Sequence, residues 1–264
     1  MDTLSLRHDG AIATLTLNRP QALNALDLQM TMELSAVTSL LETDARVRCV
    51  VVQGAGDHFM AGGDIKTFHQ GLDDPAEQRQ LGFERMIAEV HASITRLRRM
   101  PKPVIASVHG AVAGFGISLM SACDLVIAAD NSYFTLAYCH IGTSPDGGST
   151  YALPRSVGTK AAMEIALLGD RFDAPRALAL GLVNRVVALA DRAAATDALA
   201  ARLAQGPTAV YGRTKRLINE SLEHSLAEQL LAEQQSFAAS AACPDFAEGV
   251  SAFVEKRKPS FRGT

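Results

Sequence analysis

The N-terminal part of the chain changes from a strand-like to a helix-like spacing of apolar residues. Leu4–Arg7 and Ala11–Leu17 alternate apolar and polar positions on either side of the turn pair Asp9-Gly10, and this pattern predicts a β-hairpin. After Asp27 the apolar residues recur at helical intervals, as Met30, Leu34, Val37 and Leu41. The spacing predicts an amphipathic helix with Asp27 as its N-cap.

The middle of the chain alternates short apolar segments with helical patterns. Cys49–Val52 is rich in β-branched residues and predicts a strand covered on both faces, and Pro103–Val108 and Leu125–Ala128 predict two further strands. Helical patterns lie between these strands, over Glu84–Leu97 and Gly116–Cys123. This order predicts an α/β fold built on a sheet through about residue 190.

From Val187 onward the pattern is helical only. The expected helices span Ala190–Gln205, Thr208–Glu220, Leu226–Ala241 and Phe246–Arg257. This part carries more leucine than a lone helix needs, at Leu222, Leu226, Leu230 and Leu231. We therefore expect it to pack on its own domain or on a neighbouring subunit. The chain divides into a domain over residues 1–190 and a helical region over residues 191–264.

Composition and charge narrow the class of protein. Of the 264 residues, 48% are hydrophobic and 20% are charged, which is typical of a globular protein with a sizeable core. The net charge is −3, and the basic residues are scattered apart from short groups. Because binding to a phosphate backbone needs a concentrated positive face, we expect no nucleic-acid partner.

The N-terminus and the apolar stretches indicate where in the cell the protein is expected. Met1–Leu4 has no basic residues ahead of an apolar stretch, so no secretory signal is expected. The longest uncharged apolar stretch, Val108–Cys123, is shorter than the ~20 residues that a membrane-spanning helix needs. We expect a cytoplasmic protein without membrane association.

The cysteines are Cys49, Cys123, Cys139 and Cys243. They form no CxxC pair, and most of them have apolar neighbours in the sequence. This arrangement favours buried free thiols over disulfides or zinc ligands, and no metal site is expected.

Two glycine-rich segments are the candidates for chemistry. Phe59–Ile65 follows the strand at Cys49–Val52, and His109–Gly116 leads from a predicted strand directly into a predicted helix. Glycine permits close approach to a backbone, and a helix N-terminus offers free N–H groups. Two such N–H groups that converge on one carbonyl oxygen form an oxyanion hole, whereas the simpler alternative is two tight turns. A phosphate loop is disfavoured because neither GxxxxGK[ST] nor GxGxxG is present.

Short motifs follow one another in a fixed order along the chain. They are Leu17-Asn18-Arg19-Pro20 with Leu23-Asn24-Ala25-Leu26, Phe59–Lys66, Lys102–Ala106 with Gly110 and Gly114–Gly116, Ile141–Gly148, and Gly249–Arg257. In this order they resemble the crotonase (enoyl-CoA hydratase/isomerase) superfamily. Each motif is short, but together they extend over nearly the whole chain.

The resemblance implies a fold, an assembly and a substrate. It implies a crotonase-like spiral of ββα repeats over residues 1–190 and a C-terminal helical trimerisation region over residues 191–264. Trimers of this family usually pair into hexamers. The substrates would be acyl-CoA thioesters, with coenzyme A as part of the substrate and no separate cofactor. By position, the backbone N–H groups of Gly63 and Phe115 would be the oxyanion donors that stabilise a thioester enolate.

Further positions match substrate contacts of the family. They are Ala61, Asp64, Ile65, Lys66, Gly114, Ser118, Tyr138, Phe253 and Lys256. In this set, Lys66, Phe253 and Lys256 match positions that contact coenzyme A, with surface charge or helix packing as the alternative. Asp64 is expected to brace its loop, and Tyr138 to line the pocket.

The chain departs from the hydratases of this family at two positions. Two glutamates that activate water in those enzymes are replaced by Ser118 and Tyr138. Neither a serine nor a tyrosine hydroxyl is a base near neutral pH without special activation, so we expect poor hydratase activity or none.

A different carboxylate, Asp146, stands where enoyl-CoA isomerases and phenylacetate-pathway epoxy-CoA isomerases of the family place a catalytic Asp or Glu. One carboxylate can move a proton between two carbons of an enolate, and the same site could instead assist opening of an aryl epoxide. Alternatively, Asp146 is a turn residue, because Pro-Asp-Gly is a strong turn sequence. His140 is a second candidate base, in a segment expected to be a strand.

Other functions of the same residues stay open. A hydratase, a hydrolase or a decarboxylase could use the same oxyanion hole with another proton donor. A non-catalytic CoA-thioester-binding protein is a further alternative, although it would have no reason to hold a carboxylate at position 146. The sequence favours an acyl-CoA isomerase.

Overall fold

The computed structural model describes all 264 residues and begins with the predicted hairpin. Strands β1 (Leu4–Asp9) and β2 (Ile12–Leu17) pair antiparallel, with Asp9 opposite Ile12. The turn is therefore Gly10-Ala11, one residue later than the predicted pair, because Asp9 is still in the ladder. Gly10 supplies the positive φ of 54° that this tight connection needs.

The central sheet has six strands in the order β1-β2-β3-β4-β6-β9. Beyond the hairpin all neighbours run parallel, through β3 (Cys49–Gly54), β4 (Val104–Val108), β6 (Leu125–Ala129) and β9 (Arg185–Val187). A smaller sheet has the order β5-β7-β8, with β5 (Ala111–Ala113), β7 (Tyr133–Thr135) and β8 (Phe172–Asp173). The α/β fold and the three buried strands are confirmed.

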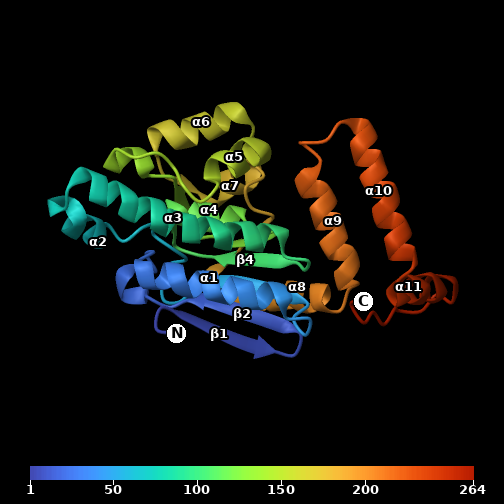
Figure 1. The fold of residues 1–264 in the computed structure, drawn as a ribbon. Helices are drawn as coiled ribbons and strands as arrows, with labels where there is room; N and C mark the ends of the chain where they lie inside the picture. The colour runs from blue at the N-terminus through green and yellow to red at the C-terminus, as the bar shows by residue number, and fades with distance from the viewer.

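Helices cover the central sheet on both faces, as Figure 1 shows. On one side α1 (Leu28–Thr43) packs against α3 (Ala76–Arg99), and Asp27 caps α1 by accepting a 2.8 Å hydrogen bond from the Met30 N–H, as predicted. On the other side α8 (Arg192–Ala204) lies against β3, β4 and β6. Alternate residues of β3 divide between the two cores, Val50 and Val52 on one side and Cys49 and Val51 on the α8 side.

Short helices build the rest of the body. They are α2 (Ile65–Gln70), α4 (Phe115–Ser121), α5 (Ser149–Val157), α6 (Thr159–Leu168) and α7 (Ala174–Ala179). Single turns of 3-10 helix lie at Pro20–Ala22 (η1), Gly71–Asp73 (η2), Tyr138–Ile141 (η3) and Leu189–Asp191 (η4). None of the helices is both long and apolar enough to cross a membrane.

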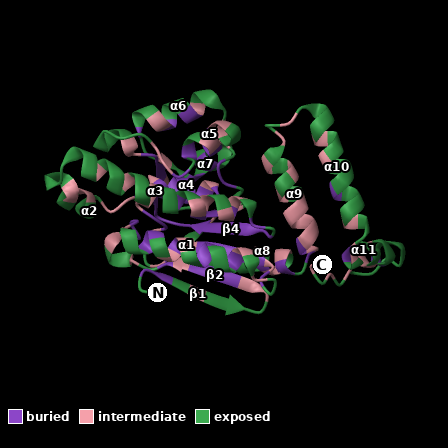
Figure 2. Ribbon diagram, viewed as in Figure 1, coloured by how far each residue is buried: buried purple, intermediate pink, exposed green.

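Three C-terminal helices stand beside the body (Figure 1): α9 (Thr208–Glu220), α10 (Leu226–Ala241) and α11 (Pro244–Val254). The Lys215 ammonium attaches α9 to the body, since it donates 2.8 Å hydrogen bonds to the Leu97 carbonyl and to the Asp124 carboxylate. Figure 2 shows α10 largely exposed. Leu222, Leu226, Leu230 and Leu231 are 68%, 74%, 54% and 53% exposed, so they do not pack on this chain's own body. Helix α8, by contrast, packs on the sheet although it lies beyond residue 190.

Some predicted boundaries are wrong. Helix α3 begins at Ala76 instead of Glu84, because its first two turns are polar and show no apolar period. Helix α4 ends at Ser121 and α11 ends at Val254, two and three residues before the predicted ends. The cysteines are free thiols, but only Cys49 is fully buried, while Cys139 is exposed on η3.

Candidate active site

The two glycine-rich segments lie side by side in the structure. The Met60 N–H donates to the Ala111 carbonyl at 3.0 Å, and the Ala113 N–H donates to the Met60 carbonyl at 2.8 Å. Strand β5 therefore stands between β4 and α4, where the sequence predicted a direct connection. A Cβ atom at Gly114, whose φ is +51°, would lie 3.3 Å from the Gly62 Cα, so the close approach requires glycine.

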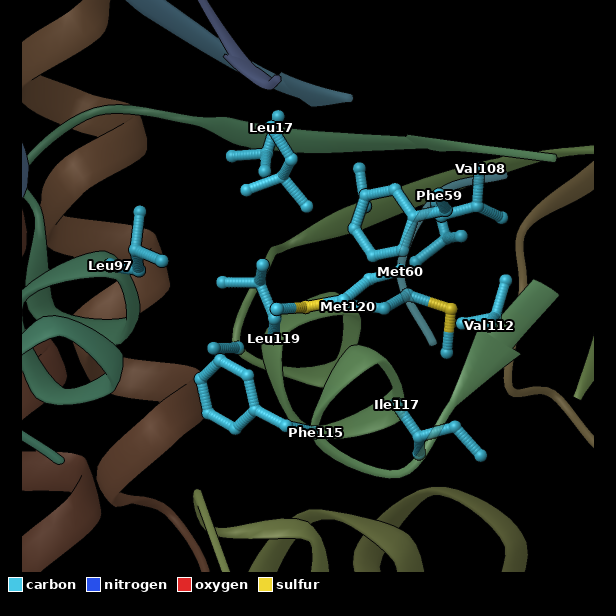
Figure 3. Close-up of a cluster of buried hydrophobic side chains, with 14 of the residues drawn as sticks. Leu17, Phe59, Met60, Leu97, Val108, Val112, Phe115, Ile117, Leu119 and Met120 are labelled. Carbon is cyan, nitrogen blue, oxygen red and sulfur yellow. The ribbon is translucent and has the colours of Figure 1, made fainter. Parts of the chain in front are cut away.

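The same buried core anchors both segments. Figure 3 draws Phe59 and Met60 of the first segment in one cluster with Phe115, Leu119 and Met120 of α4. All five side chains are at most 2% exposed. Close packing of this kind fixes the backbone positions of both segments relative to each other.

Each segment offers a backbone N–H that is free to bind an anion. The neighbours of Gly63 are paired with Leu26, since Gly62 accepts from the Leu26 N–H at 2.8 Å and Asp64 donates to the Leu26 carbonyl at 2.9 Å. The Gly63 N–H has no such acceptor. Phe115 is the first residue of α4, so its N–H has no partner inside the helix. The two predicted oxyanion donors thus both border the same cavity.

This acyl cavity, as we call it, has a volume of about 450 Å³. It is closed by the two glycine segments, by α3 and by the loop that carries Asp146. Its lining is mostly apolar, with Phe68 and Phe83 in edge-to-face contact at 4.9 Å between ring centroids. Asp146 is the one carboxylate among the lining residues.

Hydrogen bonds hold the Asp146 loop. The Tyr138 hydroxyl donates to the Asp146 carboxylate, and the Ser118 hydroxyl donates to the Asp146 carbonyl at 2.8 Å. Burial and the neighbouring negative charge of Asp146 raise the pKa of Tyr138, so this phenol stays a proton donor at neutral pH. The next residue, Gly147, donates its N–H to His91 Nε2 at 3.3 Å.

Gly147 also explains why this loop reaches the cavity wall. A Cβ atom at Gly147, with φ of +61°, would lie 2.7 Å from the Phe115 ring and 2.8 Å from the Ser118 Cβ. Any larger residue would push the Asp146 loop away from the N-terminus of α4. Glycine at this position therefore lets the loop pack against the Phe115 ring and Ser118.

Asp64 braces the first segment, as predicted. Its carboxylate caps α2 by accepting from the Lys66 and Thr67 N–H groups and pairs with Arg19 at 3.0 Å. Arg19 also pairs with Asp27, the N-cap of α1, at 3.1 Å. Burial opposes ionisation of Asp64, but the hydrogen bond from Arg19 and the backbone bonds outweigh it and lower its pKa.

The structure brings together some of the predicted site residues and not others. Those that line the acyl cavity are Ala61, Gly63, Ile65, Gly114, Phe115, Tyr138 and Asp146. Those that do not line it are Asp64, Lys66, Ser118, Phe253 and Lys256. Ser118 is buried behind the loop, and Phe253 is 86% exposed on α11. His140 lines the cavity, but the expectation of a strand around it is wrong, because it lies in η3.

Sequence reasoning missed one wall of the cavity. Helix α3 contributes Phe83, Met86, Ile87 and His91. These residues recur at helical spacing, and the core residues Val90 and Leu97 continue the same helix. This spacing is the sequence signal that could have indicated the wall. Arg19 was also missed, and its position between two aspartates is visible only in three dimensions.

Comparisons with known proteins find relatives along nearly the whole chain. The family model for enoyl-CoA hydratase/isomerase matches residues 7–264. A 1,2-epoxyphenylacetyl-CoA isomerase of Escherichia coli (strain K12) is 37% identical over 252 residues, which cover 96% of this chain and 95% of that protein. A probable enoyl-CoA hydratase of Mycobacterium bovis is 34% identical over 261 residues, which cover 98% of each chain.

A solved structure extends the comparison to the fold. The crystal structure of an enoyl-CoA hydratase from Polaromonas sp. JS666 has a TM-score of 0.92 to this chain at 34% identity. The match covers 98% of this chain and 99% of that one. It confirms the crotonase-like fold, including the presence of the C-terminal helices.

Proposed function

The chain belongs to the enoyl-CoA hydratase/isomerase family, and from that premise we propose that it is an acyl-CoA isomerase that works through a thioester enolate. One observation favours an isomerase over a hydratase. Asp146 is the one carboxylate lining the acyl cavity, while Ser118 and Tyr138, at the positions of the hydratase glutamates, both donate hydrogen bonds to Asp146. No second carboxylate is available there to activate water.

The proposed reaction uses the backbone and one side chain. The Gly63 and Phe115 N–H groups bind the thioester oxygen and make the adjacent carbon more acidic. Asp146 removes a proton from that carbon, and the electron pair passes into the enolate. The same carboxyl then returns the proton to the far carbon of the extended enolate, so that a 3-enoyl-CoA becomes a 2-enoyl-CoA. The substrate regains the proton that it loses, so the reaction needs no co-reactant and no cofactor.

An aryl epoxide is a second candidate substrate. The relative from Escherichia coli is named for 1,2-epoxyphenylacetyl-CoA, and the rings of Phe68 and Phe83 contribute aromatic surface to the lining of the cavity. With such a substrate the same oxyanion donors would hold the thioester while the epoxide opens.

The remaining binding residues are part of the proposal. Ala61, Ile65 and Gly114 border the acyl group, and Lys66 on the exposed face of α2 contacts coenzyme A. Phe253 and Lys256 would reach the site from a neighbouring copy, because neither lines the cavity of its own chain. This arrangement requires a neighbouring copy, and we propose a trimer or a dimer of trimers, located in the cytoplasm, in which the exposed leucines of α10 are covered.

The experiment that tests the activity compares three substrates. The purified protein is incubated with a 3-enoyl-CoA, with a 2-enoyl-CoA and with an aryl epoxy-CoA, and the products are followed by mass spectrometry. We expect double-bond migration or epoxide opening to exceed hydration by orders of magnitude. Hydration of the 2-enoyl-CoA at a comparable rate would refute the proposal in favour of a hydratase. Turnover of none of the three would also refute it and would leave a hydrolase, a decarboxylase or a non-catalytic CoA-thioester-binding protein.

A further inference from the structure

One hydrogen bond joins two walls of the acyl cavity. His91, on α3, accepts from the Gly147 N–H through its Nε2 at 3.3 Å. His91 lines the cavity, and Gly147 directly follows the lining residue Asp146. Helix α3 has 24 residues and packs along α1. The bond therefore ties the loop that carries the proposed base to a well-supported helix.

This bond holds one end of the peptide unit between Asp146 and Gly147. At the other end, the Asp146 carbonyl oxygen accepts from the Ser118 hydroxyl at 2.8 Å and from the Ser149 hydroxyl at 3.3 Å. The Gly147 N–H has no backbone acceptor, so its partner is His91. A peptide unit is planar, and the Asp146 Cα is one of its atoms. Anchoring both ends therefore fixes the direction in which the Asp146 side chain leaves the backbone.

Glycine would otherwise let this peptide unit turn over. Gly147 has φ of +61°, and glycine adopts positive and negative φ about equally readily. Such a rotation would move the Gly147 N–H away from α3 and redirect the Asp146 carboxylate. The Tyr138 hydroxyl bonds to the carboxylate and not to the peptide. On the N–H side, the acceptor that opposes the rotation is His91.

We propose that His91 is a positioning residue for the isomerisation, acting through the Asp146 loop. The inference rests on the proposed function, in which Asp146 moves the proton. A nitrogen that accepts a hydrogen bond uses its lone pair for that bond, so Nε2 of His91 is engaged by the loop. His91 keeps the Asp146 carboxylate aimed at the acyl group and exchanges no proton with the substrate.

A pair of substitutions separates the acceptor from the rest of the side chain. His91→Gln keeps an acceptor at the end of a side chain of similar length, whereas His91→Leu has none. Glutamine and leucine are both good helix formers, so α3 should persist in both variants. The control is His8→Asn, which changes an exposed histidine of β1 outside the acyl cavity.

The assay follows a 3-enoyl-CoA near neutral pH. We expect kcat to fall about 3- to 10-fold in His91→Leu with little change in KM, because one neutral hydrogen bond that orients the base is lost. His91→Gln and the control should stay near the wild-type kcat. A wild type that does not isomerise a 3-enoyl-CoA at all would refute the proposed function, before any variant is compared.

Three kinetic results would overturn the positioning role in an active isomerase. A higher KM with unchanged kcat in His91→Leu would make His91 a wall residue only. Equally slow His91→Gln and His91→Leu enzymes would mean that the imidazole ring itself takes part in the reaction. A His91→Leu enzyme as fast as the wild type would mean that the loop needs no anchor on α3.

A double variant tests whether His91 acts through Asp146. In Asp146→Asn the proposed base is already absent, so adding His91→Leu should leave the residual rate unchanged within about twofold. A residue that contacts the substrate directly, or that only stabilises the fold, would slow the double variant by the same factor as the single one. Such an additive loss would overturn the proposal.

Discussion

The Tyr138 hydroxyl donates a hydrogen bond to the Asp146 carboxylate. This bond orients the carboxylate of Asp146. The raised pKa of this phenol keeps it protonated, so the bond persists at neutral pH. Tyr138 and Asp146 are therefore one hydrogen-bonded pair in the lining of the acyl cavity.

Removing this hydrogen bond should slow the proposed isomerisation. In Tyr138→Phe the Asp146 carboxylate loses its phenol donor and can rotate away from the acyl group, so we expect kcat on a 3-enoyl-CoA to fall about tenfold with little change in KM. Tyr151→Phe is the control, because the Tyr151 hydroxyl bonds to Glu223 outside the acyl cavity. A Tyr138→Phe enzyme as fast as the control would show that the phenol does not orient the base.

The oxyanion donor at Phe115 can be tested by a pair of substitutions. Phe115→Pro removes the backbone N–H, whereas Phe115→Ala keeps it, and both lose the same buried ring. Proline is tolerated at the first position of a helix, which Phe115 occupies. We expect the proline variant to be ~10²–10³ slower than the alanine variant in single-turnover assays. Equal rates in two variants shown to be folded by circular dichroism would rule out this donor.

The ion pair and the helix cap made by Asp64 predict that the folded chain loses stability in acid. Its pKa is lowered from the ordinary 3.8 in the folded chain, so the stabilisation is fully present above pH 3.8 and is lost as the pH falls through the folded value. The asparagine of Asp64→Asn cannot ionise, so this variant should lose less stability than the wild type as the pH falls below 3.8. Urea unfolding from neutral pH down to about pH 3 measures how the free energy of unfolding of each protein changes with pH. The same pH dependence in the wild type and in Asp64→Asn would contradict this assignment.

Exposed leucines on the C-terminal helices predict assembly. Leu226 and Leu230 are 74% and 54% exposed in the isolated chain, and an apolar surface of this kind is normally covered. We expect sedimentation at micromolar concentration to give three or six times the chain mass of 28.0 kDa. Leu230→Glu should weaken the assembly, and a wild-type monomer under these conditions would overturn it.

Local signals in the sequence were sufficient for much of the fold. The hairpin, the Asp27 cap and the buried strands were predicted correctly because each depends on neighbouring residues. The start of α3 was not, because its first turns are polar and solvent-facing and carry no period. The turn of the hairpin was misplaced by one residue, since the ladder continues through Asp9.

The site was less predictable than the fold. Gly63, Phe115 and Asp146 were chosen from glycine patterns and family position, and they do border one cavity. Ser118 was expected to contact substrate, but its hydroxyl turns to the Asp146 carbonyl behind the loop. That choice depends on packing between α4 and a loop far away in the sequence, which no local pattern encodes.

The sharpest prediction concerns Asp146. Asp146→Asn keeps the size and the turn preference of the residue but cannot accept a proton, so a 3-enoyl-CoA should still bind while isomerisation slows by ~10²–10⁴. Stopped-flow binding and a spectrophotometric assay of 2-enoyl-CoA separate the two effects.

In Asp146→Asn the slower isomerisation should come from the missing base and not from a displaced loop. In Asp146→Asn the side-chain amide oxygen can still accept from the Tyr138 hydroxyl, and the Ser118 bond goes to the backbone carbonyl, so the loop keeps its anchors. Asp170→Asn, an exposed carboxylate outside the acyl cavity, is the matched control and should keep the wild-type rate. If Asp146→Asn binds the acyl-CoA normally and retains more than about a tenth of the isomerase rate, Asp146 is a turn residue and the base lies elsewhere, with His140 the next lining residue to test.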